Sequence, residues 1–217
     1  MNQSTTFTIL LGGALRLTDR LRAAVSGSRF IAADGGMRHA IALGAEPELW
    51  VGDFDSTPAD LLEAFPRVTR QPYPAAKAAT DGEIAVLEAI DRGAVRLILA
   101  GAMGGERSDH AIQHLLYGLQ LAEKGFDVLL TSGDEEAVPL PPGELELDLP
   151  AGSLFSVLGF SDLNGLFIDN ARYPLSDFHL PFGGSRTISN VAEGPVRFSL
   201  GSGRAVVLAR PYDLTGV

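Results

Sequence analysis

The stretch VRLILAGAMGGERSDHAIQHLLYGLQLAEKGFDVLL, residues 95–130, decides the fold class of this chain. Its apolar runs Val95–Ala100 and Phe126–Leu130 predict two buried strands. Between them, a glycine-rich loop leads into a predicted helix at residues 108–124, where apolar side chains recur on one stripe and Gly125 follows as a stop. The side chains of that stripe are Ile112, Leu115, Leu116, Leu119 and Ala122. A strand, a helix and a second strand in this order predict a parallel βαβ unit.

The same alternation extends back to the beginning of the chain. Further buried strands are expected at Phe7–Leu11, Arg29–Ala33 and Leu49–Gly52. Further helices are expected at Thr18–Val25, Met37–Leu43, Pro58–Ala64 and Asp81–Asp91. This repetition predicts an N-terminal doubly wound, mostly parallel sheet with helices on both faces.

The pattern changes near residue 134. Gly133–Glu136 and Pro139–Gly143 are rich in turn residues and predict a connection, beyond which the helical period disappears. We therefore expect α/β class with two domains: an α/β domain at residues 1–134 and a smaller, sandwich-like all-β domain at residues 135–217.

Short strands are expected in the second domain. They lie at Glu144–Leu149, Leu154–Phe160, Leu166–Ile168, Val196–Leu200 and Ala205–Ala209. Asn164-Gly165 and Gly201-Ser202-Gly203 predict two hairpin turns between neighbouring strands.

Composition narrows the possible function classes. The 217 residues carry 17 basic and 27 acidic side chains, a formal net charge of −10, which argues against broad binding of nucleic acid or anionic membranes. The absence of cysteine excludes disulfides, thiolate metal sites and cysteine nucleophiles. No secretory signal pattern and no run of about 18 apolar residues occurs, so we expect a cytoplasmic protein.

Two acidic turns follow predicted strands. The first, Asp34-Gly35-Gly36, contains glycines that let the backbone approach a ligand closely, although it also suits a plain turn with Asp34 as a helix cap. The second contains Asp53 and Asp55, which both face the same crevice if Phe54 points into the core. Close carboxylates repel each other unless a cation lies between them, and a phosphate substrate favours Mg²⁺. A solvated turn is the alternative for this segment.

Two further clusters lie where helices are expected to begin. Lys77 and Thr80–Glu83 suit a phosphate site at a helix start, and Thr80 with Glu83 also matches a capping box. Residues 101–110 join a strand to the long helix through glycines, and Arg107 offers a fork of donors for phosphate oxygens. Strand, glycine loop, arginine and helix start together favour phosphate binding.

The sequence also contains patterns typical of two other kinds of site. His110 and His114 have the spacing of a helical zinc site, but Ala111 stands where zinc hydrolases carry glutamate. Residues 53–57 match the nucleophile motif of the haloacid-dehalogenase phosphatases. In that family the motif usually follows the first strand and needs a later lysine and an acidic pair. Here two strands come before the strand that leads into the motif, and no convincing later lysine and acidic pair follows.

In their order, the clusters resemble those of thiamin pyrophosphokinases. That family combines Asp-Gly-Gly, Gly-Asp-Phe-Asp-Ser, Lys-Asp-x-Thr-Asp, Gly-x-x-Gly-Gly-Arg-x-Asp-His and a C-terminal Ser-Asn pair. The matching residues here are Asp34–Gly36, Gly52–Ser56, Thr80-Asp81, Gly101–His110 and Ser189-Asn190. The resemblance spans nearly the whole chain.

The resemblance implies a homodimer with shared active sites, in which ATP transfers a pyrophosphoryl group to the hydroxyl of thiamin, giving thiamin diphosphate and AMP. The implied catalytic residues are Asp53, Asp55, Asp81 and Arg107, and the three carboxylates among them would hold Mg²⁺. The implied nucleotide contacts are Asp34, Gly35, Gly36, Lys77, Thr80, Gly104, Gly105, Arg107 and Asp109. Asp81, Ser189 and Asn190 would bind thiamin, the last two from the partner subunit. The first domain would then bind ATP and Mg²⁺, and the second would bind thiamin and form the dimer.

Three departures from the family pattern keep alternatives open. Ala78 replaces an acidic residue, Glu106 is inserted before the arginine, and the only tryptophan is Trp50. Stacking on the thiazolium would then fall to Phe178 or Phe182. A related enzyme or binding protein for another small alcohol, and more distantly an aspartate-nucleophile phosphatase, are the alternative functions.

Overall fold

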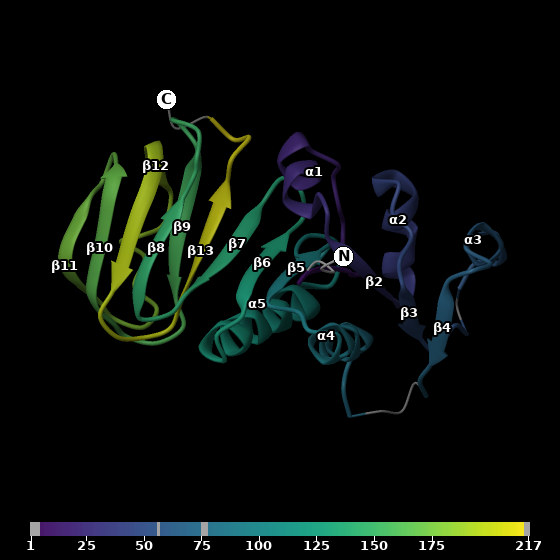
Figure 1. The fold of residues 1–217 in the computed structure, drawn as a ribbon. Helices are drawn as coiled ribbons and strands as arrows, with labels where there is room; N and C mark the ends of the chain where they lie inside the picture. Colours follow the sequence, from purple (N-terminus) through teal and green to yellow (C-terminus); the bar gives the residue numbers. More distant parts are fainter. Residues whose placement is uncertain (1–4, 56, 75–77, 215–217) are drawn as a thin grey trace. The chain divides into compact units, whose positions relative to one another are not determined.

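The computed structural model describes residues 5–55, 57–74 and 78–214 and confirms the predicted fold class, an α/β part followed by an antiparallel β part (Figure 1). The chain forms two compact units. One comprises residues 1–111 and 126–133, and the other comprises residues 112–125 and 134–217.

The first unit contains a six-stranded sheet in which every neighbouring pair is parallel. Its strands, in spatial order, are β6 (Asp127–Thr131), β5 (Arg96–Ala100), β1 (Thr6–Leu10), β2 (Arg29–Ala33), β3 (Leu49–Gly52) and β4 (Thr69–Pro72). The chain moves outward from β1 to β4 and then returns to add β5 on the other side of β1. The order therefore reverses between β1 and β5, which is where open α/β sheets form their ligand crevice.

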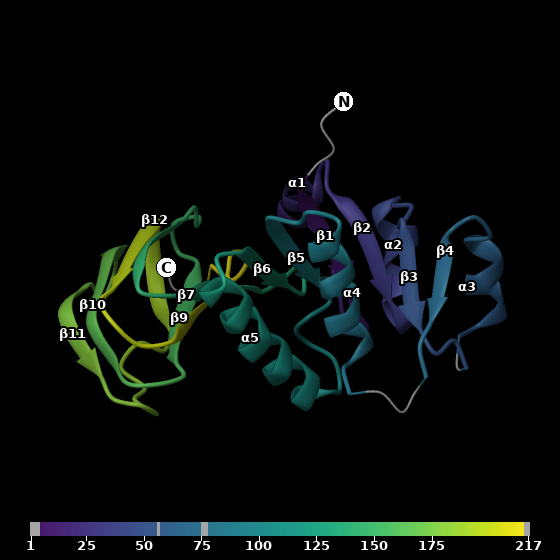
Figure 2. The same cartoon turned by 60° about the horizontal axis from the view of Figure 1, so that its bottom comes forward.

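The faces that this unit's helices cover follow from the handedness of the connections between its strands. They are α1 (Asp19–Val25), the 3₁₀ turn η1 (Asp34–Met37), α2 (Arg38–Leu43), α3 (Ala59–Ala64), α4 (Asp81–Asp91) and the beginning of α5 (Ser108–Glu123). Because strand-to-strand crossovers are right-handed, the reversal of direction after β4 sends α4 to the face opposite α1 and α2 (Figure 2). Helices cover both faces, as the alternation predicted.

Strand β4 had no counterpart among the sequence predictions. Its residues are polar and mostly exposed, because it lies at the free edge of the sheet and buries little against a neighbour. Pro72 at its end is typical of an edge strand. The strand therefore lacks the pattern of apolar residues from which the other strands of this sheet were predicted.

The second unit consists of antiparallel strands, with most of α5 also assigned to it. Its strands are β7 (Glu136–Leu140), β8 (Gly143–Leu147), β9 (Leu154–Gly159), β10 (Leu163–Ala171), β11 (Leu175–Leu180), β12 (Asn190–Leu200) and β13 (Ala205–Arg210). The long strand β12 pairs with β9 at its start and with β8 and β10 further along. It thereby joins the row β7-β13-β9-β12 to the row β8-β12-β10-β11.

Both predicted hairpin turns in this unit are wrong. Asn164-Gly165 lies inside the continuous strand β10, where Gly165 has a φ of 64° and the register shifts, so the pair forms a bulge. Gly201–Gly203 does connect β12 to β13, but these strands do not pair, because β9 lies between them. Asn-Gly and glycine-rich sequences indicate only that the backbone can adopt a positive φ, which occurs in bulges and open connections as well as in hairpin turns.

Each unit has its own apolar core. In the first, Trp50, Met37 and Leu10 are fully buried and pack together with Phe54 at the margin. In the second, Phe155 and Phe198 meet edge to face, with ring centroids 5.5 Å apart, inside a cluster that draws on nearly every strand.

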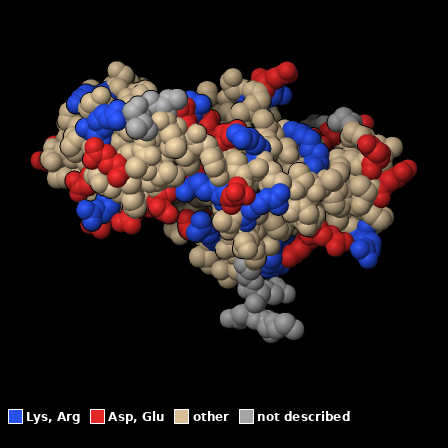
Figure 3. All heavy atoms as spheres, turned by 90° about the horizontal axis from the view of Figure 1, so that it is seen from above, with Lys and Arg blue, Asp and Glu red and all other residues tan. Residues whose placement is uncertain are grey.

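The charges on the face drawn in Figure 3 are mixed, with basic and acidic side chains interspersed. The surplus of carboxylates is therefore not gathered into a single patch on that face. No helix in the described part of the chain is long and apolar enough to cross a bilayer.

Candidate active site

The carboxyl ends of the six parallel strands lie along one edge of the first unit's sheet, here called the carboxyl edge. Loops leave this edge after every strand, and most of the sequence-predicted site residues belong to them. The loops after β1 and β5 flank the point where the strand order reverses, and the loops after β2 and β3 follow next to them.

The backbone of the Asp34 turn is held against its neighbours. Asp34 has a φ of 45°, and its carbonyl oxygen accepts a hydrogen bond of 2.9 Å from Nε1 of the buried Trp50. A Cβ added to Gly52 would lie 3.3 Å from Cα of Asp34. The structure therefore brings the acidic turn after β2 directly beside the beginning of the acidic turn after β3, as one crevice requires.

The Asp53–Asp55 turn reaches the carboxyl edge in a different way from the one predicted. Phe54 does pack toward the core, with its ring 5.2 Å from that of Trp50 in an edge-to-face contact. However, β3 ends at Gly52 and Phe54 has a φ of 61°, so the strand alternation on which the prediction depended has already stopped. Instead the chain turns, and the Asp55 N–H donates to Oδ1 of Asp53 at 3.2 Å. Asp53 is half-buried and Asp55 is exposed.

The start of α4 is a capping box. The Thr80 hydroxyl accepts from the Glu83 N–H at 3.2 Å, and Glu83 Oε2 accepts from the Thr80 N–H at 2.8 Å. The sequence pattern predicted this arrangement, and Asp81 is the first residue of the helix. Ala78 is exposed, and Lys77 lies outside the described residues.

The metal site remains a prediction. Among the described residues, no three carboxylates or histidines lie close enough together to hold an ion. The donor chemistry of Asp53 and Asp55 nevertheless suits Mg²⁺, which is commonly bound through one or two carboxylates together with water and the phosphates of a substrate. Asp81 is the third ligand that the motifs predict.

The glycine loop after β5 makes very close backbone contacts. Gly101, Gly104 and Gly105 all have φ values between 77° and 94°. A Cβ added to Gly101 would lie 2.6 Å from the carbonyl oxygen of Leu11. The loop therefore adopts its path only with glycine at these positions, and it packs against the loop that follows β1.

Arg107 lies at the end of this loop and is engaged by Asp109. Its Nε and Nη2 donate to the two carboxylate oxygens at 3.0 and 2.8 Å. Both side chains are exposed. These hydrogen bonds hold the pKa of the Asp109 carboxyl well below its usual range. Arg107 would have to share or exchange this partner to bind a phosphate.

The loop after β1 was not identified from the sequence. The Gly13 N–H donates to the Gly101 carbonyl at 3.1 Å, and a Cβ on Gly13 would lie 2.4 Å from that oxygen. The buried imidazole of His39 donates from Nε2 to the Gly13 carbonyl at 2.9 Å, and its burial lowers the pKa of the ring. A signal did exist: Gly12-Gly13 follows the first apolar run just as Gly35-Gly36 follows the second.

Ser189 and Asn190 lie in the second unit and differ in accessibility. Asn190 is 4% exposed, and its side chain accepts from the Tyr173 and Val191 N–H groups and donates to the Tyr173 carbonyl. Ser189 is exposed with a φ of 57°, and its N–H donates to Ser156 Oγ at 3.0 Å. Asn190 thus positions the chain around it, and Ser189 presents its side chain to solvent.

The two aromatic alternatives in this unit also differ. Phe178 packs against the core, whereas Phe182 is 71% exposed. Of the two, Phe182 is therefore the ring that a ligand can reach.

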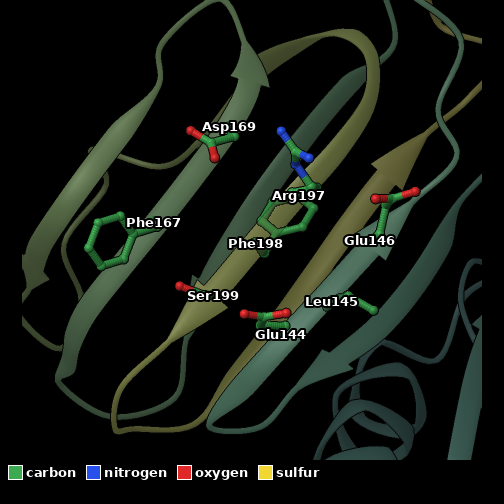
Figure 4. Close-up of a pocket in the computed structure, with 8 residues that line it drawn as sticks. All are labelled: Glu144, Leu145, Glu146, Phe167, Asp169, Arg197, Phe198 and Ser199. Carbon is green, nitrogen blue, oxygen red and sulfur yellow. The ribbon is translucent and has the colours of Figure 1, made fainter.

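The second unit also has a hollow of about 580 Å³ on the outer side of β8, β10 and β12 (Figure 4). Cross-strand register places Arg197 between Glu146 and Asp169, and Ser199 between Glu144 and Phe167. None of the sequence-predicted site residues lines this hollow.

Comparison with known proteins supports the motif assignment. Residues 23–130 match the family model described as thiamin pyrophosphokinase, catalytic domain. Among curated protein sequences, no significant relative is found.

Solved structures reproduce the fold over nearly the whole chain. A thiamine pyrophosphokinase from Bacillus subtilis is 23% identical with a TM-score of 0.81, covering 95% of this chain and 99% of its own. A thiamin pyrophosphokinase from Geobacillus thermodenitrificans is 25% identical with a TM-score of 0.79, covering 94% and 97%. One from Candida albicans is only 13% identical but has a TM-score of 0.77, covering 95% and 90%.

These comparisons confirm the family predicted from the motifs. Residues 23–130, which carry both acidic turns, the capping box and the glycine loop, belong to the thiamin pyrophosphokinase catalytic-domain family.

Proposed function

Because residues 23–130 belong to the thiamin pyrophosphokinase family, we propose that this chain transfers the pyrophosphoryl group of ATP to the hydroxyl of thiamin. The products are thiamin diphosphate and AMP. The observation that carries the proposal is the meeting of two acidic turns and a glycine loop at one carboxyl edge, within the segment that matches the family.

In the proposed reaction the thiamin hydroxyl oxygen forms a bond to the β-phosphorus of ATP. The bond from that phosphorus to the oxygen bridging the α-phosphate breaks, AMP leaves with this oxygen, and the hydroxyl proton passes to solvent or to a nearby base. Such a transfer depends on alignment and on neutralising charge rather than on covalent chemistry by the protein.

Several of the predicted residues have a proposed part in this chemistry. Asp53, Asp55 and Asp81 would hold Mg²⁺, which when bound neutralises the phosphate oxygens. Because Gly104 and Gly105 carry no side chains, phosphate oxygens could approach the backbone of this loop closely. The exposed Ser189 would contact thiamin, with Asn190 keeping its segment in place.

The remaining parts of the proposal concern assembly and location. We infer a homodimer whose active sites combine the first unit of one subunit with Ser189 of the other, and a cytoplasmic location. The shared site gives the second unit a role in catalysis, since the metal and nucleotide ligands predicted from the motifs all belong to the first.

The decisive experiment is an assay of AMP and thiamin diphosphate from purified protein, ATP, Mg²⁺ and thiamin, with a control that lacks thiamin. We expect AMP only when thiamin is present, and no products after chelation until Mg²⁺ is restored. Asp55→Asn should lower turnover at least about a hundredfold, because it removes a charge that organises the phosphates. The melting temperature of this variant should stay at the wild-type value. Asp91→Asn, an exposed change at the far end of α4, is the matched control and should remain active.

Two outcomes would favour the alternatives. Melting-temperature stabilisation by thiamin without turnover would identify a binding protein, consistent with the lost acidic residue at Ala78. Release of inorganic phosphate from small esters without ATP would identify a phosphatase. Full activity of a folded Asp55→Asn variant would contradict the metal assignment.

A further inference from the structure

Arg38 joins two loops at the carboxyl edge. It is the first residue of α2, and it is exposed. Its Nη1 donates to the Gly35 carbonyl at 3.0 Å, and its Nη2 donates to the carbonyls of Gly12 and of Gly13, the latter also at 3.0 Å. One guanidinium therefore ties the loop after β1 to the acidic turn after β2.

Arg38 and Arg107 differ in their partners. Within the described residues the Arg38 side chain makes no ion pair, whereas Arg107 is held by both oxygens of Asp109. A guanidinium has five N–H groups. The carbonyl contacts engage Nη1 and Nη2, so the Nε–H has no acceptor in the described part of the chain. Arg38 thus carries a full positive charge and an available donor.

The position of this charge is next to the crevice. Gly13, whose carbonyl accepts from Arg38, packs against the glycine loop, and a Cβ on Gly13 would lie 3.1 Å from the Gly104 carbonyl. Backbone carbonyls exposed beside a bound polyphosphate would repel its oxygens. Arg38 donates hydrogen bonds to three such carbonyls, those of Gly12, Gly13 and Gly35, and its positive charge offsets their partial negative charge.

We propose that Arg38 binds the polyphosphate of the nucleoside triphosphate, as a second cation beside or in place of Arg107. The inference rests on the proposed function, because it assigns a ligand to the same crevice. A planar guanidinium suits the role, since it can retain its carbonyl bonds and still donate to a phosphate oxygen.

The test is binding of three probes to the full chain by calorimetry, namely ATP with Mg²⁺, inorganic tripolyphosphate and adenosine. Arg38→Gln should weaken ATP and tripolyphosphate about tenfold or more, as expected for the loss of a charged hydrogen bond, and leave adenosine unchanged. Arg38→Lys retains the charge but not the fork, so it should recover part of the affinity. Arg67→Gln is the control, because the Arg67 side chain is 85% exposed and the residue comes just before β4, at the end of the strand opposite the carboxyl edge.

A purely structural arginine would give a different result. If Arg38→Gln weakened adenosine and ATP equally while lowering the melting temperature, or changed ATP affinity by less than about twofold, the proposal would be wrong. If the wild-type chain bound no ATP, the proposed function would fail. Tripolyphosphate binding that depends on Arg38 would then still support the anion site, and its absence would overturn it.

Discussion

Gly36 and Gly13 show how single residues permit the crevice to form. A Cβ on Gly36 would lie 2.1 Å from the Leu10 carbonyl oxygen, and a Cβ on Gly13 would lie 2.4 Å from that of Gly101. These contacts are with backbone atoms, which cannot rotate away. Gly12 differs, because a Cβ there would have no neighbour within 4 Å and its φ is not positive.

We therefore predict effects of very different size for the same substitution at two neighbouring loops. Gly36→Ala should lower the free energy of unfolding by about 2 kcal/mol or more, because the backbone must move to admit the methyl group. Gly12→Ala should change it by less than about 0.5 kcal/mol, or raise it slightly by restricting the unfolded chain. Urea unfolding of both variants measures the difference. Equal stability would show that the loops after β1 and β2 do not pack as described.

At the scale of elements, α4 links local stability to the proposed site. Its first turn follows an edge strand, and its capping box uses both side chains of the Thr80 and Glu83 pair. The Thr80 hydroxyl thus already has a structural partner at the position where the motif predicts a phosphate contact. The two roles can be separated by choosing the substitution.

Removal of the cap should destabilise the chain whether or not nucleotide binds here. Thr80→Ala should cost about 1 kcal/mol of unfolding free energy, whereas Thr80→Ser, which retains the acceptor oxygen, should stay near the wild-type value. Thermal unfolding in the absence of ligand makes the comparison. A destabilised serine variant would mean that the methyl group of Thr80, rather than its hydroxyl, supports the helix.

At the scale of the whole molecule, the predicted site residues are divided between two compact units. The metal and nucleotide candidates belong to the first unit, and Ser189 and Asn190 belong to the second. A homodimer with shared sites would join one set from each subunit, and this arrangement has a distinctive consequence for mixed dimers.

Mixing inactive Asp55→Asn and Asn190→Ala chains should restore activity. If subunits exchange at random, half of the dimers are mixed and each has one intact site, so we expect about a quarter of wild-type turnover. Mass spectrometry of the mixture verifies the mixed dimers. If verified mixed dimers stayed inactive, each site would have to be built within one chain.

Local features made much of the first unit predictable. The apolar strands of its sheet follow from short-range periodicity, and the capping box from a spacing of three residues. In the second unit, the helix α5 forms as predicted, but Ile112 and Leu116 of its apolar stripe are exposed. The Phe54 prediction shows the boundary of this reasoning. The condition that Phe54 packs inward is met, but the turn that brings Asp53 and Asp55 together begins where the strand period has ended.

The sequence by itself determined the fold class, the family and the order of the motifs, because each motif and each apolar period is formed by residues close together along the chain. Tertiary structure alone decided that Asn164-Gly165 is a bulge, that Asn190 is buried against Tyr173, and that Arg38 spans two loops. The partners in those contacts lie many residues apart, and no local pattern specifies them. They form only when strand order brings distant loops to the same edge and burial requires each polar group to find a partner.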